Sequence, residues 1–250
     1  MTQQNTPDFT KWMARPSEMG DIVTKSGKVT QGMITHLRDK YTEFTRDAKK
    51  EITSKYFEKG NLTEQAGIGI INRLFYPNQF IRKNTETKSN GLIKGTCDLF
   101  LTDSVWDVKS AWDWFTFNKS ELTHIYEWQV KAYCWLWGVK KGYLAYCLNN
   151  LPMSMLEDEY RKLFYNGKYL DHDQPEYLQA CEELKTRNTY DHVPEIERVR
   201  VWEIELTDDD IERMKKAVEV ARVQLAAIHY EIVENKERIF KIQKELKNGK

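Results

Sequence analysis

Apolar side chains recur at helical spacing in six stretches of the chain, which predicts a helix in each. The first helix begins at Thr30. The second begins after Asn61, with Thr63 near its cap, and ends before Pro77. Further helices are predicted at residues 121–138, 152–165 and 174–187, and a long one from Thr207 to about Lys247.

Residues that favour strands gather between these helices. Segments 91–101 and 105–111 are separated by turn-forming residues and predict a hairpin. Segment 141–148 is a short apolar run that suits a buried strand, and 198–206 alternates as a strand with one buried face does. This order predicts an α/β or α+β fold with a small central mixed sheet, flanking helices and a long C-terminal helix.

The chain contains no internal repeat and no low-complexity linker, so a single domain over residues 1–250 is expected. Within it, residues 1–29 are expected to be irregular, residues 30–206 to form the core and residues 207–250 to form a helical extension. Hydrophobic residues make up 40% and aromatic residues 12% of the sequence, which is enough for a sizeable core.

The formal net charge is zero, because 38 Lys and Arg residues balance 38 Asp and Glu residues. This balance gives no sign of a polyanionic partner, although a local basic groove is compatible with it. The four cysteines lack CxxC spacing and are interpreted as buried, reduced thiols. No signal peptide and no apolar run of about 20 residues is present, so a cytoplasmic protein is expected.

Asp107 and Lys109 are the first candidate functional residues. They are separated by one residue on a predicted strand, so their side chains share a face. If Asp103 and Ser104 form a two-residue turn, Asp98 lies opposite Lys109 on that face. A three-residue turn would instead separate Asp98 from the other two.

Leucine, tryptophan and valine side chains of this hairpin are expected on the opposite face, in the core: Leu99, Leu101, Trp106 and Val108.

Two carboxylates and a lysine on one face suit phosphodiester hydrolysis. Carboxylates bind a hard divalent cation that keeps coordination sites for water and phosphate. Such a cation polarises the phosphoryl group and acidifies a bound water, and a lysine neutralises charge in the transition state. The backbone carbonyl of Val108 is placed to face the same metal. An Asp-X-Lys triplet alone is a weak signal, since such triplets are common on solvated strands.

The surrounding motifs make the pattern more specific. GTCD at residues 95–98 precedes the triplet, and QVKAY at 129–133 follows it, with Gln129 and Tyr133 one helical turn apart. The order GxxD, DxK, QxxxY resembles the PD-(D/E)XK nuclease superfamily in its RecB-like branch. Three further segments are similar to phage exonucleases of the lambda exonuclease (YqaJ-like) type: GNLTEQA at 60–66, ARPS at 14–17 and RVRVWEIELTDDDIERM at 198–214.

The resemblance spans roughly residues 11–225 and implies a role for each matching residue. Asp98 and Asp107 would be the principal metal ligands, assisted by Glu64, and Lys109 would be the catalytic lysine. Gln129 would orient the lysine or the scissile phosphate. The matching DNA-binding residues are Arg15, Ser17, Gln129 and Tyr133. The chain has Asp at residue 107, where the lambda type has Glu, and the superfamily permits both.

The resemblance also implies a substrate and partners. It implies Mg²⁺, with Mn²⁺ as a substitute, and a phage-type exonuclease that acts on duplex DNA ends in a bacterial host carrying a phage or prophage. A single-strand annealing protein would be its partner, and a ring-forming homo-oligomer its assembly.

Several residues keep a structural interpretation beside the functional one. Glu64 lies in the first turn of its predicted helix, where the helix dipole favours a carboxylate. Tyr133 shares a helix with three tryptophans and could pack among them. The aromatic residues at 112–117 either contact bases or a duplex end, or pack as core or lid.

Two other functions remain as alternatives. The first is a structure- or sequence-specific DNA endonuclease on the same fold, because a fold does not determine a reaction. The second is a non-catalytic nucleic-acid-binding protein, against which the intact Asp98, Asp107 and Lys109 argue. CRISPR-associated adaptation nucleases carry a cysteine cluster near the C-terminus, and this sequence has none there.

Overall fold

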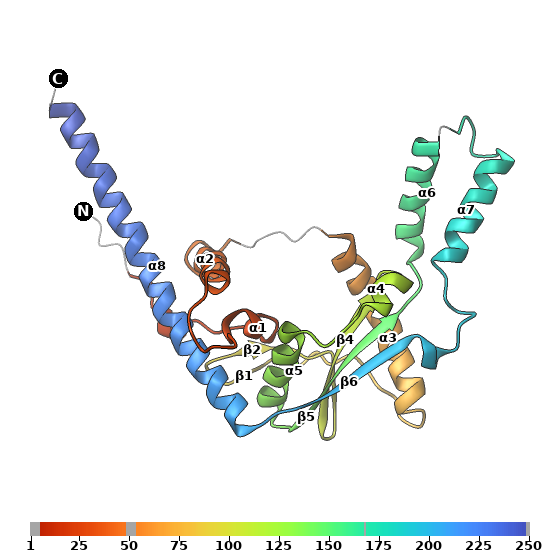
Figure 1. Ribbon diagram of the computed structural model, residues 1–250, viewed down its shortest axis with the longest axis horizontal. Coiled ribbons are helices and arrows are strands. Elements are labelled where there is room, and N and C mark those ends of the chain that lie inside the picture. The colour runs from red at the N-terminus through yellow and green to blue at the C-terminus, as the bar shows by residue number, and fades with distance from the viewer. Residues whose placement is uncertain (1–5, 49–53, 168, 249–250) are drawn as a thin grey trace.

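The architecture is that of a mixed sheet with helices on both faces (Figure 1). A computed structural model describes residues 6–48, 54–167 and 169–248. The four-stranded sheet has the order β3-β4-β5-β6, in which β3 and β6 are antiparallel to their neighbours and β4 and β5 are parallel. This confirms the predicted fold class. The strands are β1 (Lys88–Ser89) and β2 (Lys94–Gly95), which form a separate pair, β3 (Leu99–Leu101), β4 (Ser104–Ala111), β5 (Lys141–Leu148) and β6 (Val199–Glu205).

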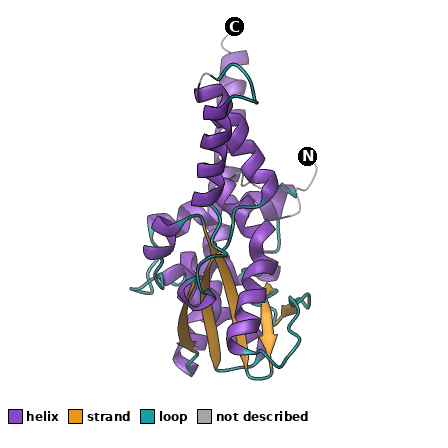
Figure 2. Cartoon of the chain, turned by 90° about the vertical axis from the view of Figure 1, so that its right-hand side faces the viewer, coloured by secondary structure: helices purple, strands orange, loops and turns teal. Residues whose placement is uncertain are grey.

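Figure 2 shows the strands side by side at one end of the molecule, with helices extending away from them. The segment before residue 30, expected to be irregular, contains one short helix and two 3-10 turns among its described residues. The helices are α1 (Met19–Ile22), α2 (Gln31–Arg46), α3 (Lys55–Phe75), α4 (Trp114–Asn118), α5 (His124–Trp137), α6 (Met153–Gly167), α7 (Pro175–Arg187) and α8 (Asp208–Asn248), and the 3-10 turns are η1 (Phe9–Lys11), η2 (Pro16–Glu18) and η3 (Glu195–Glu197).

Strand β4 contacts a different helix on each face of the sheet. Its even-numbered residues face α3, where Thr63 Oγ1 lies 2.8 Å from Ser110 Oγ and Val108 joins a core cluster. Its odd-numbered residues face α5, where the Gln129 side chain donates to Asp107. Because successive side chains alternate across a strand, α3 and α5 must cover opposite faces.

The hairpin differs from the expected one by its turn. Residues Thr102 and Asp103 form the two-residue turn, because Leu101 pairs with Ser104. The expected turn at Asp103 and Ser104 is therefore wrong, and continuing the register by one residue places Asp98 opposite Asp107 rather than Lys109. Because the residue opposite Asp98 changes by two positions, from Lys109 to Asp107, Asp98 stays on the same face of the sheet as Asp107 and Lys109. Leu99, Leu101, Trp106 and Val108 pack on the α3 side, as predicted.

Helix α3 starts earlier than the predicted start after Asn61. It begins at Lys55, and the Ser54 side chain caps it by accepting a hydrogen bond from the Tyr56 backbone N–H. Gly60 and Asn61, which suggested a boundary, lie inside the helix. Glu64 therefore lies in the third turn, outside the reach of the positive end of the helix dipole.

Strand β6 differs from the prediction that only one of its faces is buried. Val201 packs on the α3 side and Ile204 on the α5 side, because helices cover both faces of the sheet.

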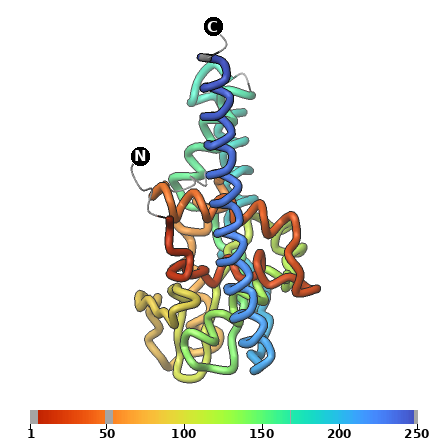
Figure 3. Tube along the Cα trace, turned by 90° about the vertical axis from the view of Figure 1, so that its left-hand side faces the viewer, coloured from red at the N-terminus to blue at the C-terminus, as the bar shows by residue number. Residues whose placement is uncertain are grey.

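Helix α8 is unbroken over about 60 Å, and its end extends past the rest of the chain (Figures 1 and 3). Within the described ranges, no helix is both long and apolar enough to traverse a membrane.

Gly67 lets α3 approach β4 closely. A Cβ added at Gly67 would lie 2.9 Å from Val108 Cγ1, closer than packed side chains allow, whereas a Cβ at Gly60 would meet nothing within 4 Å. We expect Gly67→Ala to lower the free energy of unfolding by about 1 kcal/mol, because overpacking outweighs the helix propensity gained. Gly60→Ala is the matched control on the same helix and should raise it by about 0.5–1 kcal/mol. Urea unfolding measures both, and equal effects of the two substitutions would show that α3 does not press on β4.

Candidate active site

The candidate site lies where β4 loses its neighbour on one side. Strand β3 pairs with β4 only as far as Leu99 opposite Trp106, so no further β3 pair covers β4 from Asp107 onward. Asp98, the residue before β3, compensates: its Oδ2 accepts a hydrogen bond of 2.6 Å from the Val108 backbone N–H. That bond replaces a missing ladder bond and holds the carboxylate of Asp98 beside Asp107.

Asp107 is the most enclosed carboxylate of the site, with 2% of its surface exposed. Its Oδ1 accepts a hydrogen bond of 2.8 Å from Gln129 Nε2. Its Oδ2 lies 2.8 Å from Lys109 Nζ but makes no hydrogen bond within the described part of the chain. Gln129 therefore fixes the orientation of Asp107 through one oxygen, and the other oxygen faces the Lys109 ammonium group.

Burial and neighbouring charges shift the pKa values of Asp98 and Lys109. Burial, together with the Asp107 carboxylate, raises the pKa of Asp98 to about 8, because a second negative charge in a poorly solvated site disfavours ionisation. Burial alone would lower the pKa of Lys109, but the neighbouring Asp107 and Asp98 outweigh it and raise this pKa above its ordinary value. The Lys109 ammonium group also lies 5.2 Å from the ring centroid of Tyr126. Lys109 is accordingly a cation at neutral pH.

Glu64 reaches the site from α3, on the other side of the β4 edge. Its Oε2 forms an ion pair of 2.5 Å with Lys83 Nζ, and its charge contributes to the raised pKa of Asp98. Among the described residues, no group of three or more His, Cys, Asp or Glu side chains is arranged to hold a metal ion. The third carboxylate is thus near the other two but bound to a lysine.

The metal-site and lysine residues proposed from the sequence line one open cleft of about 890 Å³. Lys83 and Tyr126 are among the cleft residues that sequence reasoning did not propose. Lys83 lies in a loop and had no periodic pattern to reveal it, whereas Tyr126 lies one helical turn before Gln129 and could have been found by that spacing. The cleft contains these predicted residues: Ser17, Glu64, Asp98, Asp107, Val108, Lys109, Gln129 and Tyr133.

No family model matches the chain, and no curated protein matches it significantly. Among solved structures, a phage-related exonuclease from Haemophilus somnus 129PT matches with a TM-score of 0.69 and 19% identity, over 89% of this chain and 97% of that one. The alkaline exonuclease LHK-Exo from Laribacter hongkongensis matches with a TM-score of 0.59 and 12% identity, over 92% and 94%. LHK-Exo in complex with dAMP gives 0.58 and 12%, over 93% and 96%.

The chain has the fold of a phage-type exonuclease. The similarity extends over nearly the whole of each neighbour, so the resemblance seen in separate sequence motifs is confirmed at the level of the fold. Identities below 20% leave the reaction to be argued from the site itself.

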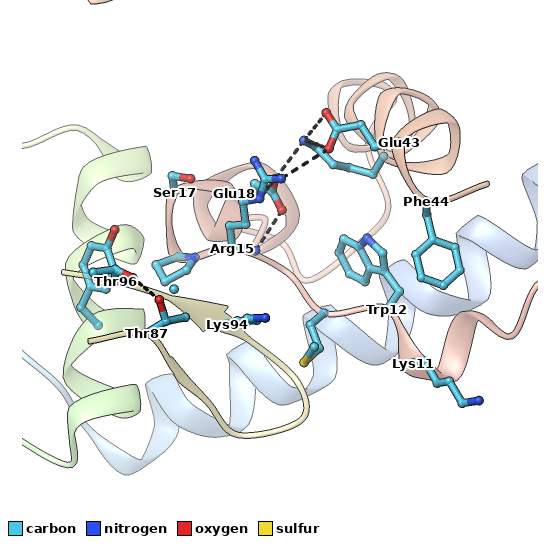
Figure 4. A pocket seen from close by; sticks show the side chains of 15 residues that line it. Lys11, Trp12, Arg15, Ser17, Glu18, Glu43, Phe44, Thr87, Lys94 and Thr96 are labelled. Atoms are coloured by element: carbon cyan, nitrogen blue, oxygen red, sulfur yellow. Dashed lines mark hydrogen bonds and ion pairs between the residues drawn. The ribbon is translucent and has the colours of Figure 1, made fainter. Parts of the chain in front are cut away.

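Within this exonuclease fold, only Ser17 of the pair Arg15 and Ser17 shares a hollow with the carboxylates. Ser17 lines the cleft, whereas Arg15 lines an adjoining pocket of about 580 Å³ that shares Ser17 and Tyr133 with the cleft (Figure 4). The Arg15 side chain is 63% exposed, and its nearest ion-pair partners, Glu18 and Glu43, are 3.8 and 3.9 Å away. Its guanidinium group is therefore only weakly engaged and is accessible to an anion.

Tyr133 lies between the two hollows. It is 7% exposed, and burial followed by the Asp107 charge raises the pKa of its hydroxyl group. Its side chain is thus a neutral hydrogen-bonding group at any physiological pH.

In the aromatic segment at 112–117, some side chains pack in the core and others line the cleft. Trp114 and Phe117 pack around a small core, and Trp112 lines the cleft, with Tyr56 5.3 Å away between ring centroids. Buried Lys59 fixes this segment by donating hydrogen bonds to the Ala111 and Trp112 carbonyl oxygens. The segment is thus partly core and partly cleft wall.

The raised pKa of Asp98 predicts a pH-dependent stability. Between about pH 4, where an unfolded Asp titrates, and pH 8, the folded state holds a proton that the unfolded state has lost, so stability falls as pH rises. In chelator, Asp98→Asn should therefore have a higher Tm than the parent protein at pH 8, and the difference should shrink towards pH 4. Glu219→Gln, an exposed change on α8, is the control and should show no such trend. A lower Tm of Asp98→Asn at every pH would contradict this assignment.

Proposed function

We propose that this protein is a metal-dependent DNA exonuclease that hydrolyses phosphodiester bonds at duplex ends. One observation carries the proposal: two carboxylates, Asp98 and Asp107, meet beside Lys109 and Gln129 at the uncovered edge of β4. The shared fold with phage-related and alkaline exonucleases supports the choice of reaction.

The residues present fit a divalent metal ion. Among the described residues, the buried Asp107 Oδ2 has an ion pair with Lys109 but no hydrogen bond, and the mutual repulsion of Asp107 and Asp98 would be relieved by a cation between them. Asp98, Asp107, the Val108 carbonyl and, after release from Lys83, Glu64 would hold Mg²⁺, or Mn²⁺ in its place. When bound, such an ion polarises the phosphoryl group and supplies an acidified water. Oxygen ligands of this kind suit hard cations.

Lys109 and Gln129 have different tasks in this proposal. The raised pKa of Lys109 keeps it protonated, so it stabilises negative charge on the phosphate in the transition state rather than accepting a proton. Gln129 acts as a positioning residue, because its side chain fixes the Asp107 carboxylate. The sequence resemblance instead implied that Gln129 orients Lys109 or the scissile phosphate.

DNA would follow the connected hollows. The exposed guanidinium group of Arg15 and the hydroxyl group of Ser17 are suited to backbone phosphates, and Tyr133 lies between them and the carboxylates. LHK-Exo binds dAMP in its own structure, which supports a nucleotide-sized site on this fold. The single nuclease domain over residues 1–250, the homo-oligomer and the annealing partner stay predictions.

The reaction type is tested by the form of the DNA. With Mg²⁺ the protein should degrade linear duplex DNA and leave covalently closed circles intact. Chelator should abolish the activity, because the proposed hydrolysis requires the cation held by Asp98 and Asp107. Gel electrophoresis of matched linear and circular forms of one plasmid gives the answer. Cleavage of closed circles would favour the endonuclease alternative, and no cleavage of any DNA would favour a non-catalytic binder.

The role of Lys109 is tested by substitution. Lys109→Ala should lower the rate of DNA degradation by about 100-fold or more, the usual effect of removing one transition-state charge stabiliser, while DNA affinity changes little. Lys140→Ala, an exposed lysine outside the cleft, is the matched control. An unchanged rate in Lys109→Ala would refute the assignment of the site.

A further inference from the structure

A smaller, separate pocket lies between α8 and the loop that leads into α2. Its volume is about 140 Å³, and none of its lining residues belongs to the cleft. The size is close to that of one large apolar side chain. The pocket does not depend on the nuclease proposal, because it uses different elements of the fold.

The floor of this pocket is aliphatic. Ile22, Val23 and Met33 are at most 3% exposed, and Ala217 and Val220 of α8 complete the surface. No aromatic ring lines it. A nucleobase, which requires a stacking partner and hydrogen bonds for its polar edge, finds neither on this floor.

The rim of the pocket is cationic. Lys28, Arg213 and Lys216 all line it and are all exposed. In the part of the chain that the structure describes, none of the three forms an ion pair with a carboxylate; Arg213 lies instead 4.7 Å from the ring centroid of Trp128. Because none of these three cations is ion-paired with another described residue, they give the rim of this apolar hollow a local positive charge in a chain whose overall charge is zero.

The loop that carries Lys28 is held in a defined shape. Thr24 Oγ1 donates to the Lys28 carbonyl oxygen at 2.7 Å, and the Gly27 N–H donates to the Thr24 carbonyl oxygen at 3.1 Å. Gly27 has a φ of +66°, a conformation that glycine adopts without strain. The loop therefore brings Lys28 to the pocket by its own hydrogen bonds.

We propose that this pocket docks an acidic segment of a partner protein, with one bulky apolar side chain inserted between α1 and α8. The aliphatic floor would take the side chain, and Lys28, Arg213 and Lys216 would pair with flanking carboxylates. Such a combination gives an apolar anchor for affinity and charges for orientation and rate of association.

Fluorescence anisotropy with a labelled synthetic peptide, DDEEDLF, tests the proposal on the full chain. The peptide should bind saturably, and its affinity should fall with rising salt because exposed charges contribute. Peptide DDEEDSS, which lacks the apolar end, and peptide KKRRKLF, which reverses the charge, should each bind at least about tenfold more weakly.

Two variants separate the contributions of the pocket. The double substitution Lys28→Glu with Lys216→Glu changes only exposed side chains and should weaken DDEEDLF binding by about tenfold or more. Ala217→Phe should fill the pocket and abolish binding. Lys241→Glu with Lys244→Glu, two exposed residues farther along α8, is the charge-matched control, and nuclease activity should be the same in all these proteins.

Three outcomes would overturn the proposal: no saturable binding of DDEEDLF, equal binding by the parent protein and the Lys28→Glu, Lys216→Glu double variant, or displacement of the peptide by a short single-stranded oligonucleotide that competes at this pocket. Circular dichroism melting of each variant identifies any that fails to fold, and the peptide controls on the parent protein still decide the question.

Discussion

The geometry of this site depends on where β3 begins, at Leu99. Because β3 pairs with β4 only as far as Trp106, the Val108 backbone N–H has no strand partner on that side, and the Asp98 carboxylate accepts its hydrogen bond instead. The same uncovered edge leaves β4 accessible from both faces of the sheet. Glu64 from α3 and Gln129 from α5 can therefore border one cleft, although their helices cover opposite faces.

This arrangement holds like charges close together. Asp98 and Asp107 repel each other in a poorly solvated site, as the raised pKa of Asp98 indicates, and Lys109 and Lys83 compensate only part of the charge. A site that is destabilised without a cation gains stability when a cation binds. Strain of this electrostatic kind is common in catalytic centres, where groups are arranged for the reaction rather than for folding.

The sequence predicted the elements better than it predicted their contacts. Alternation and spacing located β5, β6 and α5 to within a few residues, and the motif order brought Asp98, Asp107 and Gln129 together. The start of α3 was wrong, because Gly60 and Asn61 are tolerated inside a helix that tertiary packing stabilises. The turn was placed one residue late, and Lys83 was missed, because loop residues that meet only in the folded chain leave no periodic pattern.

We propose that the carboxylates at the edge of β4 form a divalent metal site. Anomalous diffraction from crystals soaked in Mn²⁺ tests it most directly. A peak within coordination distance of Asp98 and Asp107, on the side of the Val108 carbonyl and lost in Asp107→Asn crystals, is the expected result. A fully occupied ion elsewhere on the protein, with no peak between these two carboxylates, would contradict it.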